Sequence, residues 1–161
     1  MKKSLALVIA LLVLAPGAAL ADDPLVRFEG GIGSSPAALV GGVLVANTAR
    51  GVNPGGRPWV IAGLSVDVRT TGRISVDGQG LLLAGGDGVG TTGNQSVRAK
   101  LFCGPAAAQT VHDSALVPLE PNGDFRIGGE LTPPPPETCT TPVLLIVSGG
   151  GNWFAAGIPA N

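Results

Sequence analysis

The sequence predicts an all-β protein, and three features carry this prediction. The chain is rich in turn-forming residues, with 26 glycines and 14 prolines among its 161 residues. From Trp59 onward apolar residues alternate with polar ones, which is typical of strands with one buried face. No segment carries the pattern of an amphipathic helix of useful length. We therefore expect seven to nine short strands packed as a two-sheet antiparallel sandwich, with an open barrel as the alternative.

The first 21 residues predict a secretory signal peptide. A basic start precedes an apolar run over Leu5–Leu14, and a small-x-small motif ends at Ala21. The run is too short to span a membrane, and neither a twin arginine nor a cleavage-site cysteine is present. We expect a Sec-type signal cleaved after Ala21, a secreted or periplasmic product, and a single domain over residues 22–161.

The charge balance argues against two classes of partner. Without the two lysines of the signal, eight basic residues face eleven acidic ones, a net charge of −3. No basic cluster is present to bind nucleic acid or an anionic membrane. No second long apolar run follows the signal, so we expect no membrane insertion after cleavage.

Cys103 and Cys139 are the two cysteines of the chain. Because the signal directs the chain to an oxidising compartment, we expect them to form a disulfide. Closing a loop of this length stabilises the fold by about 4 kcal/mol on the chain-entropy model. Two free thiols or metal ligands are the alternative.

Alternation and turn chemistry together predict a hairpin over residues 64–76. Two alternating segments flank Thr70-Thr71-Gly72, a three-residue loop with glycine at the left-handed position. This register sets Val68 opposite Ile74 and makes one face of the hairpin apolar.

Further strands follow from the same pattern. They are expected at Leu81–Ala84, Val97–Cys103, Ala115–Leu119, Phe125–Leu131, Pro142–Val147 and Trp153–Ile158, and less strongly at Val26–Glu29 and Leu39–Ala46.

One glycine-rich segment has the spacing of a dinucleotide-binding loop, Gly88-x-Gly90-x-x-Gly93. That site requires a helix after the glycines, whereas the sequence that follows alternates as a strand. We therefore interpret the segment as a loop between two strands and expect no nucleotide and no cofactor. Asp87 in this loop is a candidate ligand contact, although one carboxylate is little support for calcium.

Two groups of residues resemble parts of hydrolytic sites. His112-Asp113-Ser114 contains the triad residue types, but neighbouring side chains diverge, so an exposed loop histidine is the preferred interpretation. Asp67 and Asp77 lie diagonally across the predicted hairpin at a spacing compatible with a glycosidase pair. Solvated acids on a polar sheet face are the preferred interpretation. A single histidine and a bridged cysteine pair also predict no zinc site.

The outward face of one strand is the best candidate for ligand binding. In Val97–Cys103, alternate residues point inward, which leaves Arg98, Lys100 and Phe102 on the other face. Phe102 either covers that sheet face or contacts a protein or glycan partner.

Two resemblances accompany these patterns. The segments VRAKLFC, VPLEPNGDFRI and CTTPVLLI resemble the layout of transthyretin-like and Ole e 1-like sandwiches, which implies an immunoglobulin-like or transthyretin-like arrangement of strands. The segments PWVIAGL, GRISVDGQGLLLAGG and WFAAGI resemble a family of small exported bacterial proteins to which no activity has been assigned. This second resemblance implies a bacterial source and adds no catalytic residue.

Together these observations favour an exported, non-enzymatic β-protein that serves as a structural or interaction module. A carbohydrate- or surface-binding module is the first alternative, and a small secreted hydrolase is the second.

Overall fold

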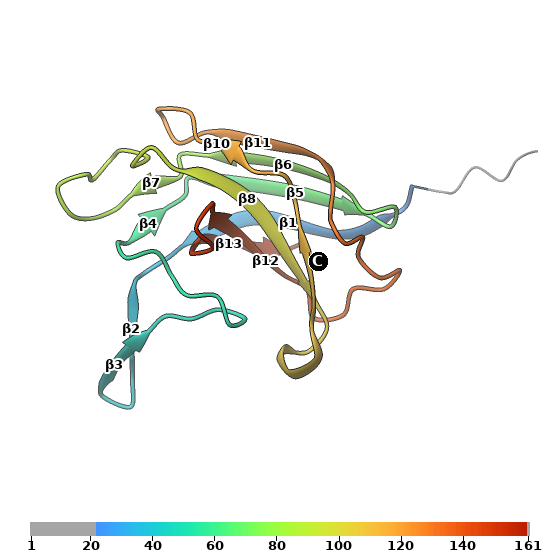
Figure 1. Cartoon of the computed structure of the whole chain (residues 1–161), viewed down its shortest axis with the longest axis horizontal. Helices are drawn as coiled ribbons and strands as arrows, with labels where there is room; N and C mark the ends of the chain where they lie inside the picture. Colours follow the sequence, from blue (N-terminus) through green and yellow to red (C-terminus); the bar gives the residue numbers. More distant parts are fainter. Residues whose placement is uncertain (1–21, 161) are drawn as a thin grey trace, which may run out of the picture.

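The computed structural model describes residues 22–160, which form one large curled sheet and two small ones (Figure 1). The expected signal peptide therefore lies outside the described residues. The large sheet contains β1 (Pro24–Gly33), β5 (Gly63–Arg69), β6 (Arg73–Gln79), β8 (Ser96–Cys103), β9 (Thr110–Asp113), β10 (Val117–Pro118), β11 (Phe125–Glu130), β12 (Val143–Ser148) and β13 (Trp153–Pro159). The small sheets pair β2 (Ala37–Val40) with β3 (Val43–Ala46), and β4 (Trp59–Val60) with β7 (Leu82–Leu83). The described residues contain no α-helix, in agreement with the all-β prediction; Ala106–Ala108 forms one turn of 3₁₀ helix.

The large sheet is antiparallel and curls into a half-barrel. Its strand order is β10-β8-β12-β13-β1-β5-β6-β11, with β9 also paired to β8. Asp113, at the end of β9, and Thr132, just after β11, lie near opposite edges of this sheet. The N–H of Asp113 donates to the Thr132 carbonyl at 3.0 Å, and the N–H of Thr132 donates to the Asp113 carbonyl at 2.9 Å. The expected two-sheet sandwich is not confirmed, because β1 joins the two groups of strands into one sheet.

The length of β1 explains this difference. The sequence predicts a strand over Val26–Glu29, but β1 has ten residues and a bulge between Phe28 and Gly31. The part of β1 before the bulge pairs with β5, whereas Phe28 and the residues from Gly31 onward pair with β13. A strand of this length can pair with different neighbours on its two sides, so the sheet continues where a sandwich would divide.

The core lies inside the curl. Phe28, Val68, Val97 and Leu101 are among its fully buried side chains. The hairpin of β5 and β6 has the predicted register, with Val68 opposite Ile74. The inward row predicted for β8 is also confirmed, since its members belong to this core.

The outer face of the sheet carries a second apolar cluster. Phe102, Leu145, Val147 and Trp153 form it, and residues 47–55, which we call the strap, contribute Ala49 and Val52 as a cover. The backbone N–H of Gly55 donates to the Trp153 carbonyl at 3.1 Å, and the N–H of Trp153 donates to Asn53 at 2.9 Å. The strap is therefore hydrogen-bonded to the start of β13, and the sheet is covered on both faces in this region.

The predicted disulfide is confirmed. Cys103, at the end of β8, is bonded to Cys139 in the segment before β12, with their Cα atoms 4.8 Å apart. The bond fixes the proline-rich connection from β11 to β12 against the end of β8. None of the helical segments among residues 22–160 is long and apolar enough to cross a membrane.

Candidate interaction surface

The most distinctive surface of the molecule is the hairpin of β2 and β3, which projects from the body of the protein (Figure 1). Its sequence is AALVGGVLVA, which reads almost the same in both directions. Gly41 and Gly42 have φ angles of +57° and +83°. Positive φ at both central residues is characteristic of a type I′ turn, whose twist suits a two-residue hairpin connection. The sequence prediction of one strand over Leu39–Ala46 is wrong, because the two glycines reverse the chain inside it.

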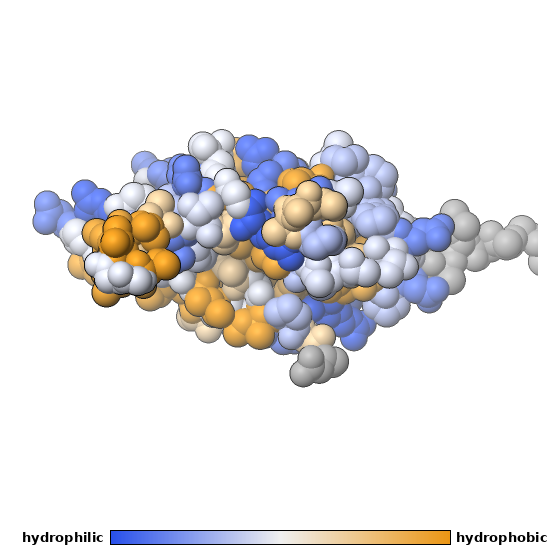
Figure 2. All heavy atoms as spheres, turned by 90° about the horizontal axis from the view of Figure 1, so that it is seen from below, coloured by the Kyte–Doolittle hydropathy of each residue, from blue (hydrophilic) through white to orange (hydrophobic). Residues whose placement is uncertain are grey.

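Large apolar side chains are exposed on both faces of this hairpin. Leu39 lies opposite Leu44 and Val40 lies opposite Val43, and directly opposed residues share a face. The exposed fractions are 71% for Leu39, 62% for Val40, 62% for Val43, 72% for Leu44 and 40% for Val45. Figure 2 shows these side chains as an apolar cluster at the left of the molecule. Contiguous apolar patches of this kind mark interaction sites.

The hairpin also lies in an uncharged part of the chain. No Asp, Glu, Lys or Arg occurs between Glu29 and Arg50. Arg50 itself is directed back to the body, where its Nη1 and Nη2 atoms donate to the carbonyls of Gly104 and Thr141, both at 2.8 Å. The projecting surface therefore presents apolar side chains without charged neighbours in sequence.

Both ends of the hairpin are fixed to consecutive residues of β13. On one side, the N–H of Ser34 donates to the Phe154 carbonyl at 2.8 Å. On the other side, Nε1 of Trp153 donates to the Asn47 carbonyl at 2.9 Å. The Phe154 ring stacks on Trp59, with ring centroids 4.0 Å apart. The hairpin is consequently held on the packed core at both ends rather than tethered by loose chain.

The outer edges of the hairpin carry unpaired backbone groups. In an antiparallel ladder, directly opposed residues alternate between hydrogen-bonded and non-hydrogen-bonded pairs. The N–H of Asn47 donates to the Pro36 carbonyl, so these two residues form a hydrogen-bonded pair and Leu39 and Leu44 form a non-hydrogen-bonded one. In this alternation the N–H and C=O groups of Leu39 and Leu44 point outward. Within the described residues, neither β2 nor β3 pairs with any other strand. Such edges are templates for pairing with a further strand.

The predicted ligand face of β8 is mostly covered. Arg98, Lys100 and Phe102 do share the outer face of the strand, but Phe102 is only 2% exposed and packs in the outer cluster. Nζ of Lys100 lies 2.9 Å from Oδ2 of Asp113. Phe102 therefore covers the sheet face, which is the first of its two predicted roles. Asp87 is exposed on the loop between β7 and β8 and does not belong to this strand face.

The interpretation of His112 as an exposed loop residue is wrong. His112 lies in β9, is 2% exposed, and has Nδ1 2.8 Å from the Pro133 carbonyl and Nε2 2.8 Å from Thr110 Oγ1. Ser114 is turned to the backbone, where its hydroxyl accepts from the N–H of Ala99. The histidine thus connects β9 to the proline-rich segment and forms no triad with Asp113 and Ser114.

The two aspartates of the hairpin are separated into two arginine networks. Asp67 lies diagonally from Asp77, as predicted, with Ser75 and Ser65 directly opposite them. Asp77 bonds to Arg126 of the neighbouring strand at 3.0 Å. Each carboxylate thus has a guanidinium partner, and the two do not face a common substrate cleft.

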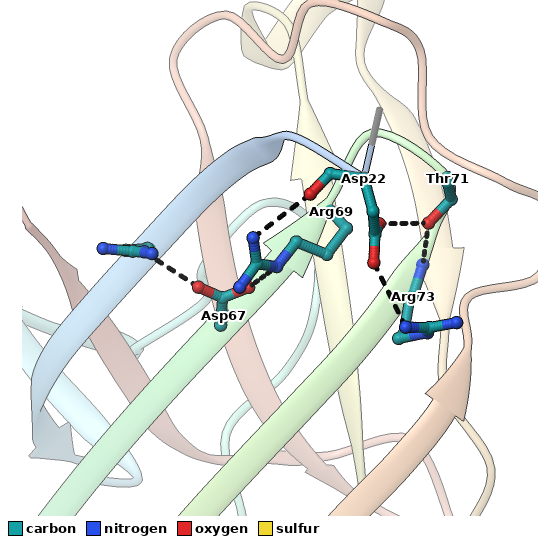
Figure 3. A network of polar contacts seen from close by, with 6 residues as sticks. Asp22, Asp67, Arg69, Thr71 and Arg73 are labelled. Atoms are coloured by element: carbon teal, nitrogen blue, oxygen red, sulfur yellow. Dashed lines mark hydrogen bonds and ion pairs between the residues drawn. The ribbon is translucent and has the colours of Figure 1, made fainter. Parts of the chain in front are cut away.

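The other network lies at the turn of the β5–β6 hairpin (Figure 3). Asp67 contacts Arg69 and also Arg27. Asp22 accepts from Thr71 Oγ1 at 2.8 Å and from Arg73 Nη1 at 3.1 Å. Arg69 and Arg73 flank this turn, and Asp22 lies beside both, since its backbone carbonyl also accepts from Arg69 Nη1 at 3.2 Å. The mutual repulsion of the two guanidinium groups is thereby offset.

A hollow of about 500 Å³ lies beside the strap. Arg57, Gln95 and Asn152 line it together with Trp59 and Phe154. Uncharged amide groups, one guanidinium and aromatic residues suit a neutral polar ligand better than a charged one.

The apolar hairpin was missed as a functional element, although the sequence contained its signal. A Gly-Gly pair between two apolar segments of four residues each indicates a two-residue hairpin. The exposure of that hairpin had no local signal, because apolar strands are normally buried.

The fold and the surface together define an all-β protein with one projecting apolar hairpin. Comparison with known proteins adds no relationship, since no family model, no curated protein and no solved structure matches the chain.

Proposed function

We propose that the protein is an exported, non-enzymatic interaction module, with residues 22–161 acting as one unit and the β2–β3 hairpin as its contact element. The observation that supports this proposal is the exposure of five large apolar side chains on both faces of one anchored hairpin. Exposed aliphatic side chains disfavour the monomer in water. Covering each one contributes on the order of 1 kcal/mol or more to an association.

Site-specific photo-cross-linking in cells that export the protein tests this function. The probe is a benzophenone amino acid at position 44, with the same probe at position 89 as the control. Val89 is 62% exposed and belongs to the glycine-rich loop after β7, which is separated from the hairpin in Figure 1. We expect a discrete adduct from position 44 and none from position 89. Equal adducts from both positions, or none from either, would contradict the proposal.

A carbohydrate-binding module is the second candidate function. The hollow lined by Arg57, Gln95 and Asn152 supports it, because amide side chains beside aromatic rings suit hydroxyl-rich ligands. A glycan array tests this candidate, with Asn152→Ala and Gln95→Ala as variants. Signals that are absent on every glycan, or unchanged in both variants, would exclude it.

The hydrolase alternative is weaker because its residues have structural partners. His112 is held by Pro133 and Thr110, and Asp77 is held by Arg126. We expect no turnover on a panel of fluorogenic ester, peptide and glycoside substrates. Activity lost in His112→Ala or Asp77→Asn, with an unchanged folded state by circular dichroism, would overturn the non-enzymatic proposal.

A further inference from the structure

We propose that the partner of the β2–β3 hairpin is a second copy of this chain, joined through antiparallel pairing of β3 with β3 of the other copy. This inference rests on the proposed function, because it names the occupant of the same surface. The product is a four-stranded ribbon related by a two-fold axis.

The backbone of the hairpin argues for a strand as the partner and against lipid. The outer edge of β3 presents the N–H and C=O of Leu44 without a partner strand among the described residues. Hydrocarbon cannot satisfy these groups, so an open two-stranded ribbon is unsuited to deep insertion in a bilayer. A strand from another chain satisfies them directly.

The charge distribution points the same way. The nearest arginines in sequence, Arg27 and Arg50, are already engaged by Asp67 and by two backbone carbonyls. Among residues 22–160, no basic cluster beside the hairpin is therefore available to attract an anionic membrane. Two copies of an uncharged hairpin meet without like-charge repulsion, whereas the net charge of −3 lies on the rest of the molecule.

The sequence of the hairpin is self-complementary, as a two-fold contact requires. In an isologous interface the same patch occurs on both sides. The near-palindrome AALVGGVLVA gives both strands the same Leu and Val rows, so pairing of β3 with its copy continues these apolar rows across the four strands. The edge of β3 also lacks the lysine, proline or bulge that commonly protects an edge strand from pairing.

Of the two edges, that of β3 is the more accessible. All four residues of Val43–Ala46 are exposed, whereas the first two residues of β2 are half-buried. The exposed apolar patch, on the order of a few hundred Å², is smaller than the ~800 Å² per partner of a standard interface. We therefore expect a weak dimer with a Kd on the order of micromolar or above.

Sedimentation equilibrium of the purified protein tests the inference over about 1 μM to about 1 mM. We expect a monomer–dimer equilibrium whose Kd rises tenfold or more in the double variant Leu39→Thr/Leu44→Thr. The matched control is Val89→Thr/Leu116→Thr, which removes exposed apolar side chains elsewhere and leaves Kd unchanged. A monomer at every concentration, or equal weakening by both double variants, overturns the inference.

Cysteine cross-linking provides a second measurement that does not depend on weakening the contact. Both native cysteines are in the disulfide, so Leu44→Cys or Val45→Cys adds one reactive thiol. A two-fold axis beside Leu44 brings the two thiols of the Leu44→Cys variant together. An axis beside Val45 does the same for the Val45→Cys variant. We expect one of them to form a covalent dimer on mild oxidation, faster than the control Val89→Cys. Equal rates at all three positions overturn the inference.

The failure of this inference is distinguishable from failure of the proposed function. An adduct from position 44 with the mass of two chains supports both. An adduct with a different protein keeps the interaction function and overturns the second copy as partner. Hairpin-dependent flotation of a monomeric protein with phosphatidylcholine vesicles also overturns the second copy, in favour of a lipid surface.

Discussion

Arg50 connects three segments that lie far apart in the sequence. Its guanidinium donates to the carbonyls of Gly104 and Thr141, and its own carbonyl accepts from Gln109 Nε2 at 3.1 Å. The residue has a φ of +52°, in the left-handed region, and its side chain reaches from the strap to these two carbonyls. A single side chain thereby fixes the strap against the region around the disulfide.

We expect Arg50→Lys to destabilise the protein by about 1.5–3 kcal/mol, which is typical of lost hydrogen bonds to a charged donor. A single ammonium cannot donate to both carbonyls with the geometry of the planar guanidinium fork. The midpoint of urea unfolding measures the change, and Arg126→Lys is the control because the Arg126 side chain is 86% exposed. Equal midpoints for the two variants would contradict this role of Arg50.

Gly33 occupies the point where β1 leaves the sheet toward the hairpin. A Cβ atom at this position would overlap the backbone carbonyl of Trp59, which cannot move easily because Trp59 N–H is bonded to the Ser34 carbonyl. Gly128, another strand glycine, has open space around the same direction.

We expect Gly33→Ala to reduce the free energy of unfolding by about 1–3 kcal/mol, as overpacking does. In contrast, Gly128→Ala should be neutral or stabilise by up to about 1 kcal/mol, because alanine restricts the unfolded chain. Chemical denaturation of the two variants side by side checks this difference. A loss in Gly128→Ala as large as that in Gly33→Ala would show that the close approach to Trp59 is unimportant.

Among the elements, β8 and the segment before β12 depend on a covalent link. Cys103 and Cys139 are separated by 36 positions, and the connection between them contains the proline-rich segment. The backbone N–H of Gly104 donates to Thr140 at 2.7 Å beside the bond. The disulfide and this hydrogen bond together hold the connection at the end of the sheet.

Replacing both cysteines by serine should lower the free energy of unfolding by about 4 kcal/mol, because the unfolded chain regains the entropy of an open loop. Urea unfolding of the variant measures this loss. The control is the native protein with and without reductant, whose reduced form should unfold near the variant. A variant as stable as the oxidised native protein would contradict the expected contribution.

For the molecule as a whole, charge and apolar surface are segregated. The acidic excess lies on the body, and the hairpin between Glu29 and Arg50 is uncharged. An association through the hairpin is therefore hydrophobic and hydrogen-bonded rather than electrostatic.

We expect the monomer–dimer Kd to change by less than about threefold between about 0.05 M and 0.5 M sodium chloride, because screening acts on charges. Sulfate should tighten the dimer, since excluded salts strengthen apolar burial. Sedimentation equilibrium in matched buffers measures both responses. A dimer that dissociates steeply with sodium chloride would indicate a contact between charged parts of the body instead.

The sequence by itself determined the features that depend on local periodicity and turn chemistry. The all-β class, the register that sets Val68 opposite Ile74, and the inward row of β8 were all predicted, because side-chain alternation is a property of the strand itself. The Cys103–Cys139 bond was predicted because the sequence predicts export to an oxidising compartment, where two cysteines have one possible intramolecular pairing.

Only the tertiary structure decided which apolar residues are covered. Phe102 and His112 are buried because the strap and the proline-rich segment lie against them, and these segments are remote in sequence. The single curled sheet exists because β1 is long enough to pair on both sides. Leu39 and Leu44 are as apolar as core residues, yet they remain exposed because no other described segment of the chain reaches their hairpin. Burial depends on what packs against a residue, which a local pattern does not contain.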